Sequence, residues 1–210
     1  MKKFPIAKDA FLYLLILLIS SIIFYFIFIP LAYFSLLLLL FVLFFFRNPY
    51  RKIPEQANII ICPADGRILS ITEIDEPMFL NSKAVKISIF LSVFNVHINR
   101  CPIKGIIKFT NYRPGKFLPA FKSHASDINE RNTIGIEGNN IKVLVHQITG
   151  FIARRIVCWV KLNEVVEKGE RFGLIKFGSC TEIIVPTNVD VKVKVGDKVK
   201  GGKNIIGVIN

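Results

Sequence analysis

Three residues at turns between apolar segments could together carry nucleophilic chemistry. Asp65 lies in the turn Pro63-Ala-Asp-Gly66, and His97 stands where an apolar segment becomes polar. Ser179 follows Gly178 between two apolar segments. A serine hydroxyl beside a histidine base, with an acid to orient that base, is an activated nucleophile. The chemistry requires the three side chains to converge in space, whatever their order in the chain.

Each of the three residues also has a simpler explanation. Aspartate in such a turn normally hydrogen-bonds its own backbone, and serine after glycine is commonly part of a turn. Most histidines are solvated or hydrogen-bonded, and the other two, His124 and His146, lie in a polar loop and in an apolar segment. The nucleophile hypothesis therefore depends on all three residues lying together.

Other kinds of site have no support in the sequence. It contains no P-loop, no dinucleotide-binding glycine pattern, no G-x-S-x-G elbow and no H-E-x-x-H zinc motif. The cysteines are far apart and form no C-x-x-C pair: Cys62, Cys101, Cys158 and Cys180. We therefore expect no metal site, and we expect the cysteines to be small buried residues in a reducing cytoplasm.

Residues 51–210 are predicted to form one mainly β (α+β) catalytic domain. Turn residues punctuate this region, and no repeat or low-complexity linker divides it. The segments between the turns are rich in Val, Ile and Phe and are predicted strands: Val85 to Leu91, Ile141 to Ile148, Arg171 to Lys176 and Thr181 to Val185. The stretch Val191 to Val195 alternates with period two, and Ile152 to Val157 is the one short segment predicted to be helical.

Residues 1–50 are predicted to be a membrane anchor in the form of a hydrophobic helical hairpin. The run Phe11 to Phe46 contains no charged residue and is nearly long enough for two crossings of about 20 residues each. Pro30 is the expected break, which gives apolar segments at about 11–29 and 31–46. A re-entrant hairpin or one long kinked helix also fits. A signal sequence does not, because its apolar region is shorter.

The positive charges that flank the anchor predict its orientation in the membrane. Basic residues flank the apolar run on both sides: Lys2, Lys3 and Lys8 before it, and Arg47, Arg51 and Lys52 after it. Because positive flanks stay cytoplasmic, we expect an even number of crossings and a catalytic domain on the cytoplasmic face. Most of the formal net charge of +13 lies after residue 50 and suits an anionic membrane surface. Nucleic acid is the rival partner and is disfavoured, because no nucleic-acid-binding motif is present.

Seven ordered motifs resemble the short, bacterial and archaeal (type A) form of phosphatidylserine decarboxylase, a pyruvoyl-dependent family. They extend over nearly the whole chain: Phe46-Arg-Asn-Pro49, Pro63-Ala-Asp-Gly66, Phe94-Asn-Val-His-Ile-Asn-Arg100, Pro114-Gly-Lys-Phe117, Asn129-Glu-Arg-Asn132, Gln147-Ile-Thr-Gly-Phe-Ile-Ala-Arg-Arg155 and Arg171-Phe-Gly-Leu-Ile-Lys-Phe-Gly-Ser179. Longer relatives carry two histidines in a Tyr-His-x-x-His-x-Pro pattern, whereas Arg100 stands here at the second. Cys180 stands where relatives often have Ser, Thr or Arg.

The resemblance implies a zymogen that cuts itself between Gly178 and Ser179 into chains 1–178 and 179–210, which remain associated. Ser179 would become a covalent pyruvoyl group, the cofactor of the family. This group would form a Schiff base with phosphatidylserine, and loss of carbon dioxide would give phosphatidylethanolamine for phospholipid biosynthesis. By the same resemblance, His97 is the base and Asp65 orients it. The expected location is the inner cell membrane, and a homo-oligomer is compatible with the sequence.

Two rival functions fit parts of the chain. The segment Val189 to Ile209 is similar to half of a lipoyl or biotinyl carrier domain, but Lys198 is not expected at a hairpin tip. A pyruvoyl decarboxylase for a soluble amino acid is the other rival. The predicted anchor argues against it, because a soluble substrate gives no reason for attachment to a membrane.

Overall fold

The computed structural model describes residues 5–116, 118, 128–150, 155–176 and 179–209, with only the backbone described for Ser179. Gly178 and His124 lie outside the described residues. The chain divides into two compact units, residues 1–50 and 51–210. Each unit is described by itself.

The first unit is a pair of apolar helices. A short 3-10 helix, η1 (Lys8–Ala10), leads into α1 (Phe11–Ile27), and α2 (Ile29–Phe45) follows. The break lies at Phe28, two residues before the predicted one, because Pro30 lies in the first turn of α2, where its missing N–H has no helical partner to lose.

Two side chains hold the helices together in an antiparallel arrangement. Ser35 Oγ donates to Leu17 O at 3.0 Å, and Ser21 Oγ donates to Ala32 O at 3.2 Å. Ala7 N also donates to Phe46 O at 2.9 Å, so the two ends of the hairpin lie side by side. The helical stretch Lys8–Ile27 is long and apolar enough to cross a membrane by length and composition, whereas the apolar helix Ile29–Phe45 is shorter.

The second unit is built from antiparallel strands. In chain order they are β1 (Ile59–Ile61), β2 (Gly66–Glu76), β3 (Ser82–Leu91), β4 (Ile98–Arg100), β5 (Gly105–Arg113), β6 (Arg131–Glu137), β7 (Lys142–Thr149), β8 (Arg155–Cys158), β9 (Val165–Val166), β10 (Arg171–Lys176), β11 (Ser179–Pro186), β12 (Val189–Val191), β13 (Lys198–Val199) and β14 (Ile205–Ile209). The predicted fold class, a mainly β domain after a helical hairpin, is confirmed. The predicted helix Ile152 to Val157 is wrong for its described part, which belongs to β8.

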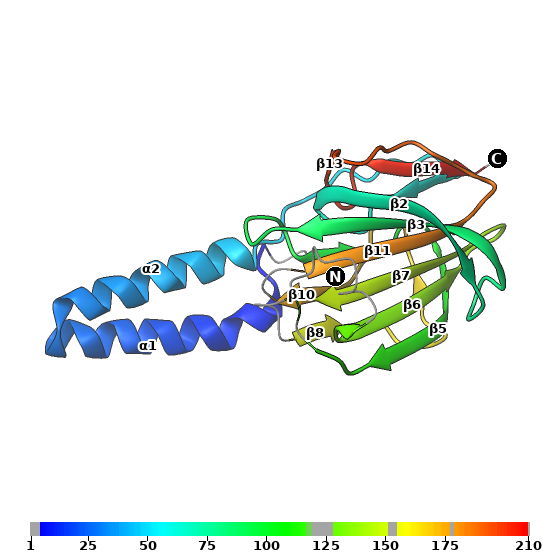
Figure 1. Cartoon of the computed structure of the whole chain (residues 1–210). Coiled ribbons are helices and arrows are strands. Elements are labelled where there is room, and N and C mark those ends of the chain that lie inside the picture. The colour runs from blue at the N-terminus through cyan, green and yellow to red at the C-terminus, as the bar shows by residue number, and fades with distance from the viewer. Residues whose placement is uncertain (1–4, 117, 119–127, 151–154, 177–178, 210) are drawn as a thin grey trace. The chain divides into compact units, whose positions relative to one another are not determined.

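The described strands of this unit form three sheets. The largest runs in the order β13-β2-β3-β11-β7-β6-β5-β9 and curls into a half-barrel, and smaller sheets run β4-β10-β8 and β1-β14-β12. Figure 1 shows β3, β11, β7 and β6 side by side, with β11 between the strand pair β2–β3 and the strand pair β6–β7. Alternating Val and Ile side chains of these strands fill the core, for example Ile87, Ile134, Val145 and Ile183. The strand β11 is therefore central to the fold.

Candidate functional site

The strand register brings the three predicted site residues to one end of the large sheet. β11 begins at Ser179, which pairs with Leu91 on one side and with Thr149 on the other. Asp65 directly precedes β2, which is the other neighbour of β3. His97 directly precedes β4, and its carbonyl accepts a hydrogen bond from Ile175 N, near the end of β10, at 3.2 Å. The chain passes from β10 into β11, so His97 and Ser179 flank the same connection.

His97 is held in place by its own loop. Its side chain is buried, and its Nδ1 lies 3.0 Å from Asn95 O. A carbonyl oxygen can only accept, so Nδ1 carries a proton, and in the neutral form of the ring the lone pair is on Nε2. Asn95 is itself fixed, because its Oδ1 accepts from both N and Oγ of Ser92 at 2.9 Å. The loop between β3 and β4 thus sets the tautomer of this histidine.

Asp65 is buried, and its carboxylate accepts hydrogen bonds from two residues other than His97. Its Oδ2 accepts from Arg51 Nη2 at 2.8 Å, and its Oδ1 accepts from Gly201 N at 2.7 Å. The structure describes no hydrogen bond between Asp65 and His97. A side chain on Gly201 would press on the Ala64 backbone at about 3.1 Å, so glycine lets this turn approach Asp65. The carboxylate ties the start of β2 to the turn that follows β13.

A second arginine, Arg100, lies close enough to feel the charge of Asp65. Arg100 Nη1 donates to Gly169 O at 3.0 Å, and burial together with the charges of Arg51 and Arg171 lowers the pKa of Arg100 to about 10, against the opposing effect of Asp65. Arg100 therefore stays protonated at neutral pH. At the position where longer relatives have a second histidine, this chain carries a permanent charge.

A series of hydrogen bonds between buried side chains joins the sheet β4-β10-β8 to the large sheet near this end. Asn99 Nδ2 donates to Thr181 Oγ1 at 3.0 Å, and Gln147 Nε2 donates to Asn99 Oδ1 at 2.9 Å. Asn132 Nδ2 in turn donates to Gln147 Oε1 at 2.9 Å. These four residues are buried. They link β4, which follows His97, to β11, which begins at Ser179.

Glu130 lies beside this end of the sheet, and sequence reasoning assigned it no role. Its carbonyl accepts from Thr149 N at 3.1 Å, and Thr149 pairs with Ser179. Its side chain is only 7% exposed, and Oε1 accepts from Tyr112 OH at 3.0 Å. The motif Asn129-Glu-Arg-Asn132 was the one signal that could have singled it out.

Comparison with known proteins gives one consistent family. The family model for phosphatidylserine decarboxylase matches residues 38–207. The phosphatidylserine decarboxylase proenzyme of Carboxydothermus hydrogenoformans is 58% identical over 166 residues, which cover 79% of this chain and 78% of the relative. This chain belongs to the phosphatidylserine decarboxylase family. Proenzymes of the same name from Symbiobacterium thermophilum and Syntrophus aciditrophicus are 45% and 46% identical, each over 78% of this chain and over 76% and 77% of their own lengths.

A second histidine of this phosphatidylserine decarboxylase family member, His146 on β7, has a structural role. His146 Nδ1 lies 2.8 Å from Thr133 Oγ1, and the ring is buried. Burial, followed by the charges of Arg131, Lys86 and Arg113, lowers the pKa of His146 to about 3. The ring therefore stays neutral at physiological pH and packs within the sheet.

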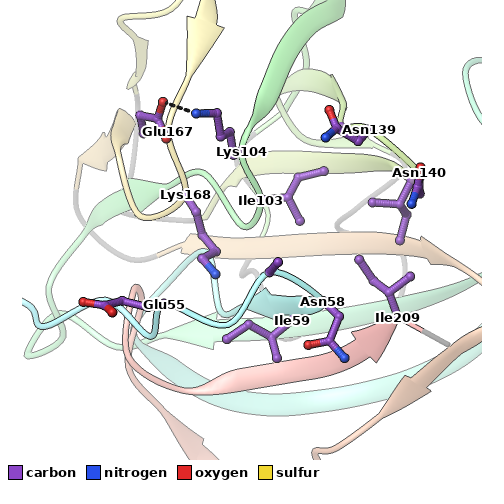
Figure 2. A pocket seen from close by; sticks show the side chains of 13 residues that line it. Glu55, Asn58, Ile59, Ile103, Lys104, Asn139, Asn140, Glu167, Lys168 and Ile209 are labelled. Carbon is purple, nitrogen blue, oxygen red and sulfur yellow. Dashed lines mark ion pairs between the residues drawn. The ribbon is translucent and has the colours of Figure 1, made fainter.

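A pocket of about 500 Å³ lies at the opposite end of the large sheet (Figure 2). Ile59, Ile103 and Ile209 line it together with Lys104, which forms an ion pair with Glu167 at 2.9 Å. Lys104 directly precedes β5, whose far end is Arg113, so this pocket is remote from Ser179. Among the described residues no group of His, Cys, Asp and Glu could hold a metal ion.

Proposed function

We propose that this chain is a phosphatidylserine decarboxylase proenzyme that cuts itself between Gly178 and Ser179. As a carboxy-lyase it removes the headgroup carboxylate of phosphatidylserine as carbon dioxide and so makes phosphatidylethanolamine. The family match carries the activity. The observation that supports this cut is the start of β11 at Ser179, beside the loop that carries His97.

The self-cleavage requires only groups of the chain and water. The Ser179 hydroxyl attacks the Gly178 carbonyl carbon, and the C–N bond breaks to leave an ester and a free amine. Loss of the Ser179 α-proton then expels the Gly178 carboxylate and leaves dehydroalanine. Water replaces the nitrogen of dehydroalanine, which departs as ammonia, and a pyruvoyl group remains at the start of chain 179–210.

His97 is the base in this proposal. Its Nδ1 donates to Asn95 O. In this proposal Nε2 takes the hydroxyl proton of Ser179 and, in the later reaction, returns a proton to the α-carbon of the product. Asp65 was expected to orient His97. Its hydrogen bonds to Arg51 and Gly201 instead support a role in fixing the turns around the site, and direct orientation of His97 stays a prediction.

The surroundings of Ser179 suit a pyruvoyl group and an amine substrate. When formed, this group supplies an electron sink for the decarboxylation. Thr149 and Leu91 flank the position through strand pairing, so backbone hydrogen bonds fix it. Glu130, two strands away, supplies a buried carboxylate.

The two chains stay associated after the cut. Chain 179–210 contributes β11, which is paired with both β3 and β7, as well as β12, β13 and β14, which pair with one another or with strands of the longer chain. Release of the short chain would remove a central strand and expose the core. The hydrogen bonds and packing of β11 therefore replace the broken peptide bond.

Membrane attachment supports a lipid substrate. The apolar helices would hold the enzyme in the inner membrane, with the catalytic domain on the cytoplasmic face, and the basic domain would attract anionic lipid by about 1 kcal/mol per Lys or Arg near the surface. The zwitterionic product is attracted less, which favours exchange of product for substrate.

The test compares substrates. Purified full-length protein in detergent should release carbon dioxide from phosphatidylserine vesicles and not from free serine, and Ser179→Ala should release none. Release from free serine at a comparable rate would contradict the lipid substrate. No release from either substrate by a folded, cut enzyme would contradict the activity.

A further inference from the structure

One buried carboxylate oxygen at the Ser179 end has no partner. Among the described residues, Glu130 Oε2 is the one buried side-chain oxygen or nitrogen without a hydrogen bond. A buried polar atom without a partner costs free energy, and in a native protein it calls for an explanation such as a ligand. The other oxygen, Oε1, is held by Tyr112 OH, so the carboxylate is fixed by one oxygen while the other is left over.

The register puts this oxygen within reach of the reacting residue. Ser179 pairs with Thr149, and Thr149 N bonds to the carbonyl of Glu130, the residue directly before β6, so Thr149 lies between Ser179 and Glu130 at one end of the sheet. Two strand spacings separate their backbones by roughly 10 Å. A glutamate side chain and one hydrogen bond of about 2.9 Å span most of that distance.

The charged residues at the Ser179 end of the sheet suit the anionic groups of the substrate better than its ammonium. A phosphoserine headgroup carries a phosphate, a carboxylate and an ammonium. The basic residues here, such as Arg155 and Lys176, suit the two anions, whereas an ammonium needs an acidic partner. Asp65 is already engaged by Arg51 and Gly201.

We propose that Glu130 binds the primary ammonium of the phosphoserine headgroup through Oε2 and positions this nitrogen beside the residue formed from Ser179. The inference rests on the proposed function and adds a residue that selects the substrate. Tyr112 is the positioning residue, because it fixes the carboxylate without contacting the ammonium.

The variant Glu130→Gln tests this, because an amide of the same shape can still accept from Tyr112. Intact mass should show normal cutting, and KM for phosphatidylserine should rise roughly 10- to 100-fold, the effect of losing a charge-assisted hydrogen bond. Glu137→Gln, at a partly exposed position at the far end of β6, is the matched control and should leave cutting and KM unchanged.

Two soluble probes separate an ammonium site from a structural role. Glycerophosphoethanolamine carries the ammonium and glycerophosphoglycerol does not. In E130Q the inhibition constant of glycerophosphoethanolamine should rise 10- to 100-fold, whereas that of glycerophosphoglycerol should barely change. Equal weakening of both probes, or of neither, would overturn the inference, as would an E130Q chain that stays uncut.

A second variant covers the case in which E130Q does not fold. Glu130→Asp keeps the charge and withdraws it by one methylene, so it should also weaken the first probe more than the second. Equal effects on both probes would again overturn the inference. Wild-type enzyme without activity on phosphatidylserine would instead contradict the proposed function, so the two failures are distinguishable.

Discussion

Replacement of Asn99 by Leu tests whether the buried amides hold the catalytic end together. The change removes the donor to Thr181 Oγ1 and the acceptor for Gln147 Nε2, and both partners are fully buried. Each buried polar group left unsatisfied costs about 1 to 3 kcal/mol. The free energy of unfolding should therefore fall by about 2 to 6 kcal/mol, a large share of the roughly 5 to 15 kcal/mol of a typical domain. Because β4 follows His97 directly, self-cleavage should also slow.

The assay is urea unfolding of the full chain in mild detergent, followed by the fluorescence of the single tryptophan, Trp159. A Ser179→Ala background keeps every sample uncut. Asn111→Leu, at an exposed position on β5, is the matched control and should change stability by less than about 0.5 kcal/mol. An Asn99→Leu chain as stable as this control would refute the role of the amides. A double-mutant cycle with Thr181→Val should give a coupling of about 0.5 to 3 kcal/mol.

Three further substitutions test the site and its surroundings. Asp65→Asn should lower the free energy of unfolding by about 3 kcal/mol in urea, because Arg51 loses its buried partner; unchanged stability with slower cutting would instead favour a direct action on His97. His97→Ala should block cutting in an intact-mass time course, and a normal rate would remove His97 from that step. His146 is neutral in the folded protein down to a pH of about 3, but in the unfolded chain it takes up a proton below about pH 6.5. Between these two pH values the free energy of unfolding of wild type should therefore fall, as the pH is lowered, by up to about 1.4 kcal/mol per pH unit more than that of His146→Gln. Parallel urea titrations at several pH values measure this difference, and equal slopes would contradict it.

Local patterns predicted much of the fold. The apolar content of Arg171 to Lys176 and the turn residues before it predicted a strand, and β10 has these bounds. The alternating stretch Val191 to Val195 is strand only to Val191, although Lys192 N still donates to Ile206 O of β14 at 2.8 Å. For the stretch predicted as a helix, β8 is strand because β10 supplies its hydrogen-bond partners, a contact that local sequence does not encode.

The candidate site was only partly predictable. The turn at Asp65 and the pair at residues 178 and 179 are visible in sequence, but one of the two partners of Asp65 is a backbone amide far along the chain, that of Gly201. The unpartnered oxygen of Glu130 is a property of packing and has no sequence signal of its own. The carrier-domain alternative is disfavoured for a similar reason, because Lys198 pairs with Arg67 in β13 and β2 and is not at a hairpin tip.

The central claim is that Ser179 becomes the pyruvoyl group through self-cleavage. Intact-mass measurement of the purified full chain tests it most directly. We expect two species for wild type, one ending at Gly178 and the other beginning with a pyruvoyl group in place of Ser179, and a single uncut species for Ser179→Ala. A wild-type chain that remains whole and still decarboxylates phosphatidylserine would contradict it.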